Sequence, residues 1–329
     1  MNLLRTVVAL VVAGLALSAC GTTEEAERTD SGSDDLGTAE AGPVSVTDAR
    51  GELVELDAPA TDVVGLEWNV VEHLVSLDVM PVGVADVEGY SDWVQVEPLD
   101  DSVVDVGGRG EPSVEAIGAL APDLIVTTTD YETSVAEDFE ERGIPVLVVE
   151  SADASEGIGQ MRENLELVAE VTGTSGRAQE LLADFDVTLD EGTQAIEEAG
   201  LAGAPFFMTD GYLDGGRLSI RPYAEGSLLS DVTEQMGLEN AWQVKGDPAY
   251  GLSETDVEGL TALPADVNFL YMANGDDDPF EEGLADNAIW NAFPFVQNGD
   301  VHRLPDGIWM FGGPTSMSAY VDAVVEALT

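Results

Sequence analysis

Short apolar runs alternate with helical patterns along the chain from residue 44 onward. The segment "VSVTDARGELVEL" predicts a small hairpin at the start of this region. Four short apolar runs predict strands, at 63–66, 82–84, 124–128 and 146–149. Patterns with a helical spacing predict helices among them, at 68–77, 113–120 and 132–142. Because strands and helices alternate, we expect a first α/β lobe with a largely parallel sheet over 43–155.

A long helical pattern follows this lobe and covers residues 156–199. Its apolar residues recur three or four positions apart, at Ile158, Met161, Leu165 and Val168, and again at Ala178, Leu181, Phe185 and Leu189. Only the segment "TGTSG" at 172–176 interrupts this apolar stripe. The pattern predicts a bridging helix over 156–199, which is long enough to cross from one lobe to another.

The alternation of strands and helices resumes after "GLAGAP" at 200–205. Apolar runs predict strands at 206–209, 218–220, 267–272 and 302–304. Helical patterns follow at 227–236 and 316–328. We therefore expect a second α/β lobe over 200–329, with a ligand cleft between the two lobes.

The first forty residues do not belong to either lobe. Arg5 precedes an apolar run at 6–17, which is typical of a signal peptide and predicts its removal as residues 1–19. The run ends in "LSAC", and Cys20 is the one cysteine of the sequence, as expected for a lipidated cysteine. The alternative is an ordinary secretory cleavage site before an unmodified cysteine. Residues 20–42 are polar and aperiodic, so we expect a flexible tether that holds the protein on the extracytoplasmic side of the cell membrane.

The charge balance of the sequence is strongly acidic. It contains 65 Asp and Glu against 11 Lys and Arg, and the formal net charge is −54 at pH 7. Such a surface repels nucleic acid and anionic lipid headgroups, so neither is expected as a partner. A solvated acidic surface suited to high salt explains this charge better than a catalytic role does.

The sequence contains few of the motifs that carry catalysis. It lacks Gly-x-Ser-x-Gly, a Walker loop, His-Glu-x-x-His and Gly-x-Gly-x-x-Gly. Its two histidines, His73 and His302, are expected to be structural, and a His/Cys metal site is not expected, which leaves a site made of oxygen ligands as the alternative. No catalytic residue, direct metal ligand or cofactor is therefore predicted.

The segment "DVGGRGEP" places Arg109, one of few cations, among glycines at 107, 108 and 110. These glycines let the backbone turn and approach a ligand closely, and the guanidinium fork suits paired oxygen atoms. Aromatic residues at the ends of expected strands and helices predict a cup for a bulky ligand, formed by Trp68, Trp93, Tyr131, Tyr212, Tyr250, Trp309 and Phe311. The alternatives are a surface arginine paired with an acid, and aromatic residues packed in a core.

Several segments carry a resemblance to a known family, in order and spacing, namely "GLEWNVVE", "VGGRGEPS", "PDLIV", "GLENAWQ" and "WMFGG". From about residue 44 to 329 the chain resembles the substrate-binding proteins of bacterial iron-siderophore ABC importers, of the ferric-hydroxamate-binding type. The resemblance implies two Rossmann-like lobes bridged by a long interdomain helix. It also implies a monomeric, non-enzymatic receptor that captures a ferric siderophore and delivers it to the permease subunits. Cobalamin or haem as cargo, or a lipid-anchored chelatase-like enzyme, are the alternatives.

The resemblance also implies roles for single residues. Arg109 and Tyr131 match residues that bind hydroxamate oxygens around the iron, which the siderophore itself holds. Trp68, Trp309 and Phe311 match aromatic residues of the family pocket, whereas Tyr250 replaces a tryptophan. Arg221 is a further candidate cation for this pocket. Trp93 and Tyr212 are further aromatic candidates. Glu115 and Asp231 match the carboxylates that dock on permease arginines.

Overall fold

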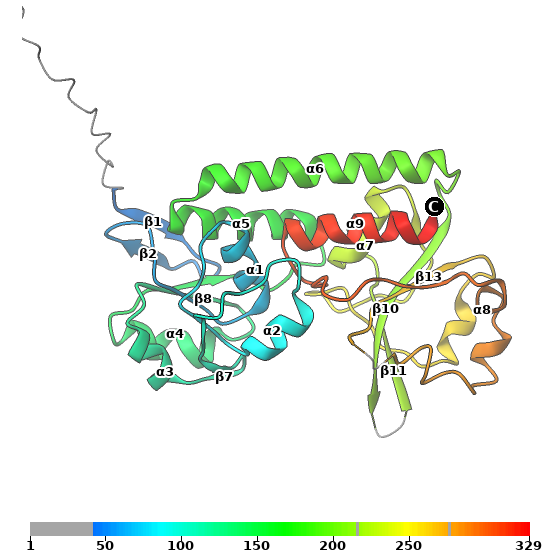
Figure 1. Ribbon diagram of the computed structural model, residues 1–329, viewed down its shortest axis with the longest axis horizontal. Coiled ribbons are helices and arrows are strands. Elements are labelled where there is room, and N and C mark those ends of the chain that lie inside the picture. The colour runs from blue at the N-terminus through cyan, green and yellow to red at the C-terminus, as the bar shows by residue number, and fades with distance from the viewer. Residues whose placement is uncertain (1–41, 215–216, 276–277) are drawn as a thin grey trace, which may run out of the picture. The chain divides into compact units, whose positions relative to one another are not determined.

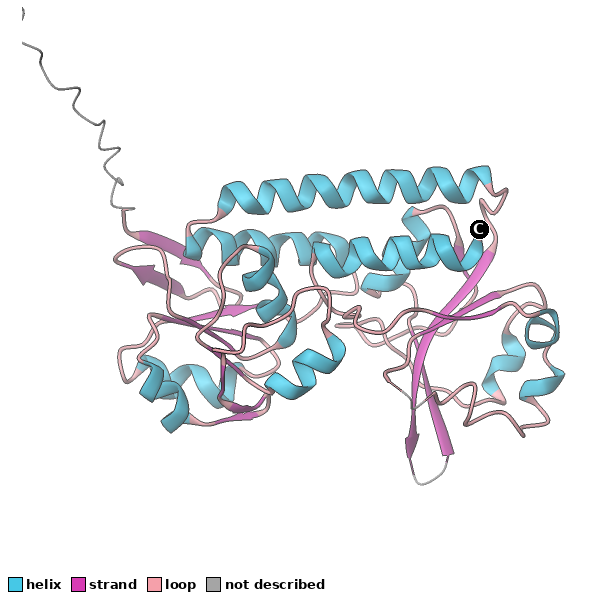
Figure 2. Ribbon diagram, viewed as in Figure 1, coloured by secondary structure: helices cyan, strands magenta, loops and turns pink. Residues whose placement is uncertain are grey.

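The computed structural model describes residues 42–214, 217–275 and 278–329 (Figure 1). The predicted signal peptide 1–19, Cys20 and nearly all of the predicted tether 20–42 lie outside these residues. The described chain contains two separate five-stranded sheets with helices beside them (Figure 2). Each sheet belongs to one α/β lobe, as the alternation of strands and helices predicts.

The first lobe is built on a parallel sheet. Across the sheet the order is β5 (Val104–Asp105), β4 (Gly83–Val84), β3 (Val63–Gly65), β8 (Leu124–Thr128) and β9 (Val146–Val149). The helices of this lobe are α1 (Trp68–Ser76), α2 (Val87–Trp93), α3 (Val114–Leu120) and α4 (Glu132–Glu140). The predicted hairpin is present as the antiparallel pair β1 (Val44–Thr47) and β2 (Leu53–Leu56). Strands β3, β4, β8 and β9 are buried because helices or loops cover both faces of a parallel sheet, whereas β5 is an exposed edge strand.

The second lobe is built on a mixed sheet. Its order is β11 (Arg217–Pro222), β10 (Pro205–Asp214), β13 (Asn268–Tyr271) and β14 (Val301–Arg303), with β12 (Glu239–Asn240) also paired to β10. The β10–β11 pair is antiparallel and the other pairs are parallel. Its helices are α7 (Leu228–Gln235), α8 (Pro294–Asn298) and α9 (Pro314–Leu328), with 3₁₀ turns at Gly259–Ala262 and Trp290–Ala292.

The bridging segment differs from the single helix expected over 156–199. The structure contains two helices there, α5 (Gly157–Thr172) and α6 (Ser175–Glu198). Gly173 ends α5 with a φ of +72°, which favours glycine, and its N–H bonds to carbonyls of the last turn. The chain then turns back, so α6 packs along both α5 and α9 (Figure 1). The chain therefore passes from the first lobe to the second along α6.

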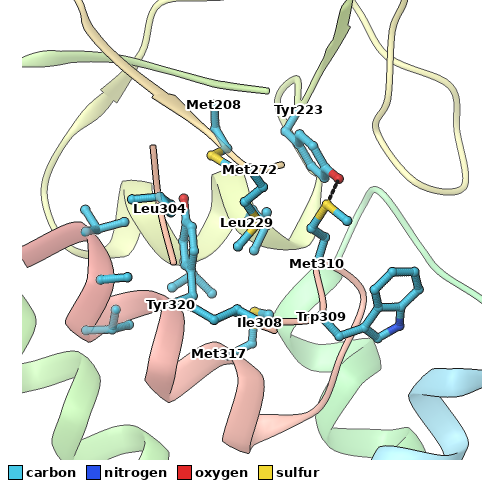
Figure 3. Packing of buried hydrophobic residues seen from close by; sticks show 14 of the residues in the cluster. Met208, Tyr223, Leu229, Met272, Leu304, Ile308, Trp309, Met310, Met317 and Tyr320 are labelled. Carbon is cyan, nitrogen blue, oxygen red and sulfur yellow. Dashed lines mark hydrogen bonds between the residues drawn. The ribbon is translucent and has the colours of Figure 1, made fainter. Parts of the chain in front are cut away.

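One apolar cluster is continuous across both lobes. Trp68 and Tyr90 of the first lobe belong to it together with Phe185 of α6 and Tyr320 of α9. Figure 3 shows its second-lobe part, where the Met310 sulfur faces the Tyr223 hydroxyl at 2.9 Å. The residues that follow β14 thus pack the second lobe onto the first.

Within residues 42–214, 217–275 and 278–329, no helix combines the length and the apolar character that crossing a bilayer requires.

Candidate functional site

The carboxyl ends of neighbouring first-lobe strands meet at one edge of the sheet. Glu67 and Trp68 follow β3, and Asp130 and Tyr131 follow β8, which is hydrogen-bonded to β3. Arg109 lies in the tip of the two-stranded ribbon formed by β6 (Gly107–Gly108) and β7 (Glu111–Pro112), directly after β5. Ligand sites in parallel α/β sheets form at this edge, because loops of several strands converge there.

A pocket of about 420 Å³ lies at this edge and takes residues from both lobes. It is lined by Glu67, Trp68, Asn69, Trp93, Arg109, Asp130, Tyr131, Arg221, Tyr250, Leu252, Trp309, Met310 and Phe311. All predicted pocket residues except Tyr212 are in this lining. Tyr212 lies on β10, and its side chain is 53% exposed. The structure thus places Tyr212 outside the pocket, because its strand extends beyond the part of the sheet that faces the first lobe.

Arg109 is both a pocket residue and a paired one. Gly107 has a φ of +104°, a conformation that favours glycine and turns the ribbon toward the pocket. The Arg109 guanidinium carbon lies 3.9 Å from the centroid of the Trp68 ring. One guanidinium N–H donates to the Glu67 carboxylate at 2.7 Å. The geometry combines a cation–π contact with a single hydrogen bond, which leaves other N–H donors of the fork for a ligand.

Glu67 was not predicted as a site residue, yet it positions both neighbours. It caps α1, and its Oε1 accepts the backbone N–H of Trp68 at 2.9 Å. Burial raises the pKa of Glu67, and the charge of Arg109 opposes this effect. Its place one residue before Trp68 was the available signal, but the chain holds too many acids for one of them to stand out.

Tyr131 and Tyr250 face the pocket from different lobes. Burial raises the pKa of Tyr131, so its phenol is neutral at physiological pH. The Tyr250 hydroxyl donates to Asp130 Oδ2 at 2.5 Å, and burial together with this bond raises the pKa of Tyr250. Asp130 is held by its own N–H, which donates to Ser151 Oγ at 2.9 Å. A hydrogen bond therefore joins the lobes at the mouth of the pocket.

Arg221 occupies the second-lobe wall in a more rigid setting. Asp210 and Arg221 are direct cross-strand partners in the β10–β11 register. Arg221 donates from Nε to Asp210 Oδ1 at 2.9 Å and from a terminal nitrogen to Oδ2. Its guanidinium carbon lies 5.8 Å from the centroid of the Phe311 ring. Asp210 is a second pairing acid that sequence reasoning missed.

Aromatic rings line the pocket as a connected set. Trp309 meets Trp68 edge-on at a centroid distance of 5.0 Å and lies 6.3 Å from Trp93. Phe311 lies 5.3 Å from Trp309 and 5.1 Å from Tyr250. Among the described residues, Trp68 and Trp309 each bury an indole N–H that has no acceptor. Six of the seven predicted aromatic residues line the pocket, and several of these rings also belong to the apolar cluster that packs the lobes together.

Behind the pocket, Glu72 of α1 caps the start of α9. Its Oε1 accepts the N–H groups of Gly313 and Ser316 at 2.9 and 3.0 Å, and its Oε2 accepts the Ser316 hydroxyl at 2.8 Å. A Cβ on Gly312 would lie 2.2 Å from Oε2, so only glycine fits this approach. Burial raises the pKa of Glu72 to about 7.

The predicted docking residues lie away from the pocket. Glu115 is exposed on α3. Asp231 is half-buried on α7, and it accepts the backbone N–H groups of Gly157 and Gly226. Burial, and then the charge of Glu234, raises the pKa of Asp231 to about 6. One of the two carboxylates is therefore free on the surface, whereas the other also holds the start of α5.

The two histidines do not line the pocket. Burial lowers the pKa of His73 to about 4, and it lowers that of His302 as well. In the part of the chain that the structure describes, no cluster of His, Cys, Asp and Glu could hold a metal ion. The groups that face the pocket are suited to noncovalent recognition of a bulky, oxygen-rich ligand.

A family model described as periplasmic binding protein matches residues 63–307. The chain is 27% identical over 266 residues to the iron(3+)-hydroxamate-binding protein FhuD of Escherichia coli (strain K12), covering 81% of this chain and 86% of the relative. It is 23% identical over 326 residues to the probable siderophore-binding lipoprotein YfiY of Bacillus subtilis (strain 168), covering 94% and 93%. The solved structure of Fe³⁺-Desferal-bound FhuD from Vibrio cholerae matches with a TM-score of 0.72 and 25% identity, covering 82% of this chain and 97% of that one.

Proposed function

Because the chain belongs to the periplasmic binding protein family, we propose that it captures a ferric siderophore, of the hydroxamate type, and delivers it to an ABC importer. Its relatives are binding proteins by name, so the expectation that it is not an enzyme is confirmed at the level of the family. The iron complex is cargo and not a cofactor. The permease subunits of the importer are the partners of this delivery.

The observation that carries the proposal is the convergence of Arg109, Tyr131 and the aromatic set on one pocket between the lobes. The Arg109 fork and the Tyr131 phenol supply donors for hydroxamate oxygens. The rings supply apolar surface for the chelate's outer shell. A volume of about 420 Å³ lies within the range of small-ligand sites.

Native mass spectrometry of protein purified from iron-limited culture tests this function directly. We expect an added mass equal to that of a ferric siderophore, which is lost when a chelator removes the iron and weakens the complex. An added mass equal to that of cobalamin or haem would identify a different cargo, and the protein would still be a substrate-binding protein. A protein that carries no ligand and binds no ferric hydroxamate when titrated would contradict the proposal.

We further propose that Cys20 carries a lipid anchor on the extracytoplasmic side, with residues 1–19 removed and 20–42 as tether. The name of the relative YfiY as a lipoprotein supports this proposal. Cys20→Ser should release the protein from the membrane fraction while the dissociation constant (Kd) for the siderophore stays unchanged. Membrane retention equal to that of the wild type would contradict it.

We propose that the protein works as a monomer, with Glu115 and Asp231 as its permease contacts. Glu115→Lys is the sharper test, because Asp231 also holds the start of α5. It should lower uptake of the iron complex by cells and leave the Kd of the purified protein unchanged. Glu198→Lys, an exposed position on α6, makes the same charge change and serves as control. Equal uptake by both variants would contradict the assignment of Glu115.

A further inference from the structure

Two arginines and two carboxylates line the pocket, and a third carboxylate, Asp210, pairs with one of these arginines from outside the lining. Arg109 is paired with Glu67, and Arg221 is paired with Asp210. Asp130 is the second carboxylate of the lining, beside Glu67, and its hydrogen-bond partner is the neutral phenol of Tyr250. In the ranges that the structure describes, no arginine, lysine or histidine forms an ion pair with Asp130. With Asp210 included, three carboxylates and two arginines meet at the pocket wall, and Asp130 is the carboxylate that no arginine pairs with.

Asp130 is also well placed to meet a ligand. It precedes Tyr131, and its side chain is exposed at the pocket mouth. Tyr250 supplies one donor, and an ionised carboxylate has about four lone-pair sites. The carboxylate can thus accept from a second donor without giving up its bond to Tyr250. A ligand could supply this second donor as a phenol or as a primary ammonium group. Only the ammonium would also neutralise the negative charge of Asp130.

We infer that the pocket selects ferric hydroxamates that carry a protonated amine, and that Asp130 is the residue that receives the ammonium group. This inference rests on the proposed function, because it names the class of siderophore for the same pocket. The iron chelate lies against Arg109, Tyr131 and the aromatic rings. Its amine-bearing arm reaches the mouth, where Asp130 and the Tyr250 hydroxyl lie together.

A matched pair of ligands tests the inference. The first is the ferric complex of desferal, a linear trihydroxamate that ends in a primary ammonium, and the second is its N-acetylated derivative, which lacks that charge. Tryptophan fluorescence titration gives the Kd of each ligand. Since an exposed ion pair is worth up to about 1 kcal/mol and a charged hydrogen bond somewhat more, we expect the wild type to bind the ammonium form roughly three- to tenfold more tightly.

Two variants locate the source of this preference. Asp130→Asn keeps an acceptor for Tyr250 and removes the charge, so it should weaken binding of the ammonium form alone and make the two ligands equal. Asp101→Asn makes the same charge change at an exposed position outside the pocket lining, so it should keep the preference. Since the net charge of −54 acts on every cation, this control separates Asp130 from the field of the whole chain.

The outcomes separate the inference from the function on which it rests. Equal binding of the two ligands by the wild type, or an undiminished preference in Asp130→Asn, would overturn the inference alone. Failure of both ligands to bind the wild type would overturn the inference together with the hydroxamate assignment.

Discussion

The contact between the lobes behind the pocket differs from the contact at its mouth. We call the Glu72 cap on Gly313 and Ser316 the rear contact, and the bond from Tyr250 to Asp130 the mouth contact. The rear contact is fully buried, with Glu72 0% exposed, and it contains three hydrogen bonds. The mouth contact is a single hydrogen bond at an exposed carboxylate.

The difference indicates which side of the pocket adapts to a ligand. Opening the rear contact would leave buried donors unsatisfied, at about 1–3 kcal/mol each. Opening the mouth contact exposes its groups to water, so it costs only about 0.5–1.5 kcal/mol. Since α6 also packs along both α5 and α9, we expect the lobes to stay fixed at the rear and to adjust to a ligand at the mouth.

The largest expected effect is the loss of the rear contact. Glu72→Ala removes the acceptor of two backbone N–H groups and one hydroxyl, so we expect the free energy of unfolding to fall by about 4 kcal/mol. Denaturant unfolding followed by circular dichroism measures this change. Ser316→Ala, which removes one of these bonds, should cost about 1 kcal/mol. A small effect in Glu72→Ala would show that the lobes are held together elsewhere.

The pH dependence of the free energy of unfolding provides a second test of the rear contact. The pKa of Glu72 is raised from 4.5 to about 7, so the folded protein holds a proton that the unfolded chain has lost between these pH values. Stability contributed by this proton is complete below pH 4.5, falls as pH rises to 7 and is lost above it. The fall amounts to about 3 kcal/mol.

Glu72→Gln is the reference for this measurement, since it cannot titrate. The free energies of unfolding of the wild type and the variant, measured from pH 4.5 to 7.5, should diverge by that amount. Parallel curves would mean that Glu72 titrates at its ordinary pKa.

The third effect concerns the pocket between the two contacts. A hydrogen bond to a charged group is worth about 1.5–3 kcal/mol, so Arg109→Ala should weaken binding of a ferric hydroxamate about tenfold to more than a hundredfold. Titration calorimetry measures the Kd. Arg109→Lys keeps a cation beside Glu67 but lacks the planar fork, so it should preserve stability and still weaken binding. An unchanged Kd in Arg109→Ala would reduce Arg109 to a structural partner of Glu67.

The smallest effect is expected at the mouth contact. Tyr250→Phe removes its hydrogen bond and keeps the ring beside Phe311, so the free energy of unfolding should fall by about 1 kcal/mol or less. The same denaturation series as for Glu72→Ala provides the value. A loss as large as that of Glu72→Ala would erase the distinction between the two contacts.

The elements of the fold were largely predictable because their patterns are local. The strands Leu124–Thr128 and Val146–Val149 have in the structure the same bounds that their sequences predict. The bridging helix was predicted as one because its apolar stripe continues past residue 173, yet Gly173 turns the backbone there. The short helix Val87–Trp93 was missed, since its seven residues include Gly89 and the polar residues Glu88, Ser91 and Asp92.

The site was predictable in its arginine and aromatic members, which are rare in this chain. Their carboxylate partners were not, because Glu67, Asp130 and Asp210 are three of 65 acids and only the fold brings them to the pocket. Tyr212 was included for its place near a strand end, and the length of β10 could not be read from its sequence. Glu72 was overlooked because its partners lie more than 240 positions away.

Quenching of tryptophan fluorescence by matched iron complexes tests the central claim most directly. Trp68, Trp93 and Trp309 line the pocket, so a bound ferric complex should quench them. A ferric trihydroxamate should bind at sub-micromolar concentration. A ferric tris-catecholate carries about three negative charges, so it should bind far more weakly, with the gap narrowing as salt screens the repulsion. Tighter binding of the catecholate at low salt, or no quenching by either complex, would contradict the account.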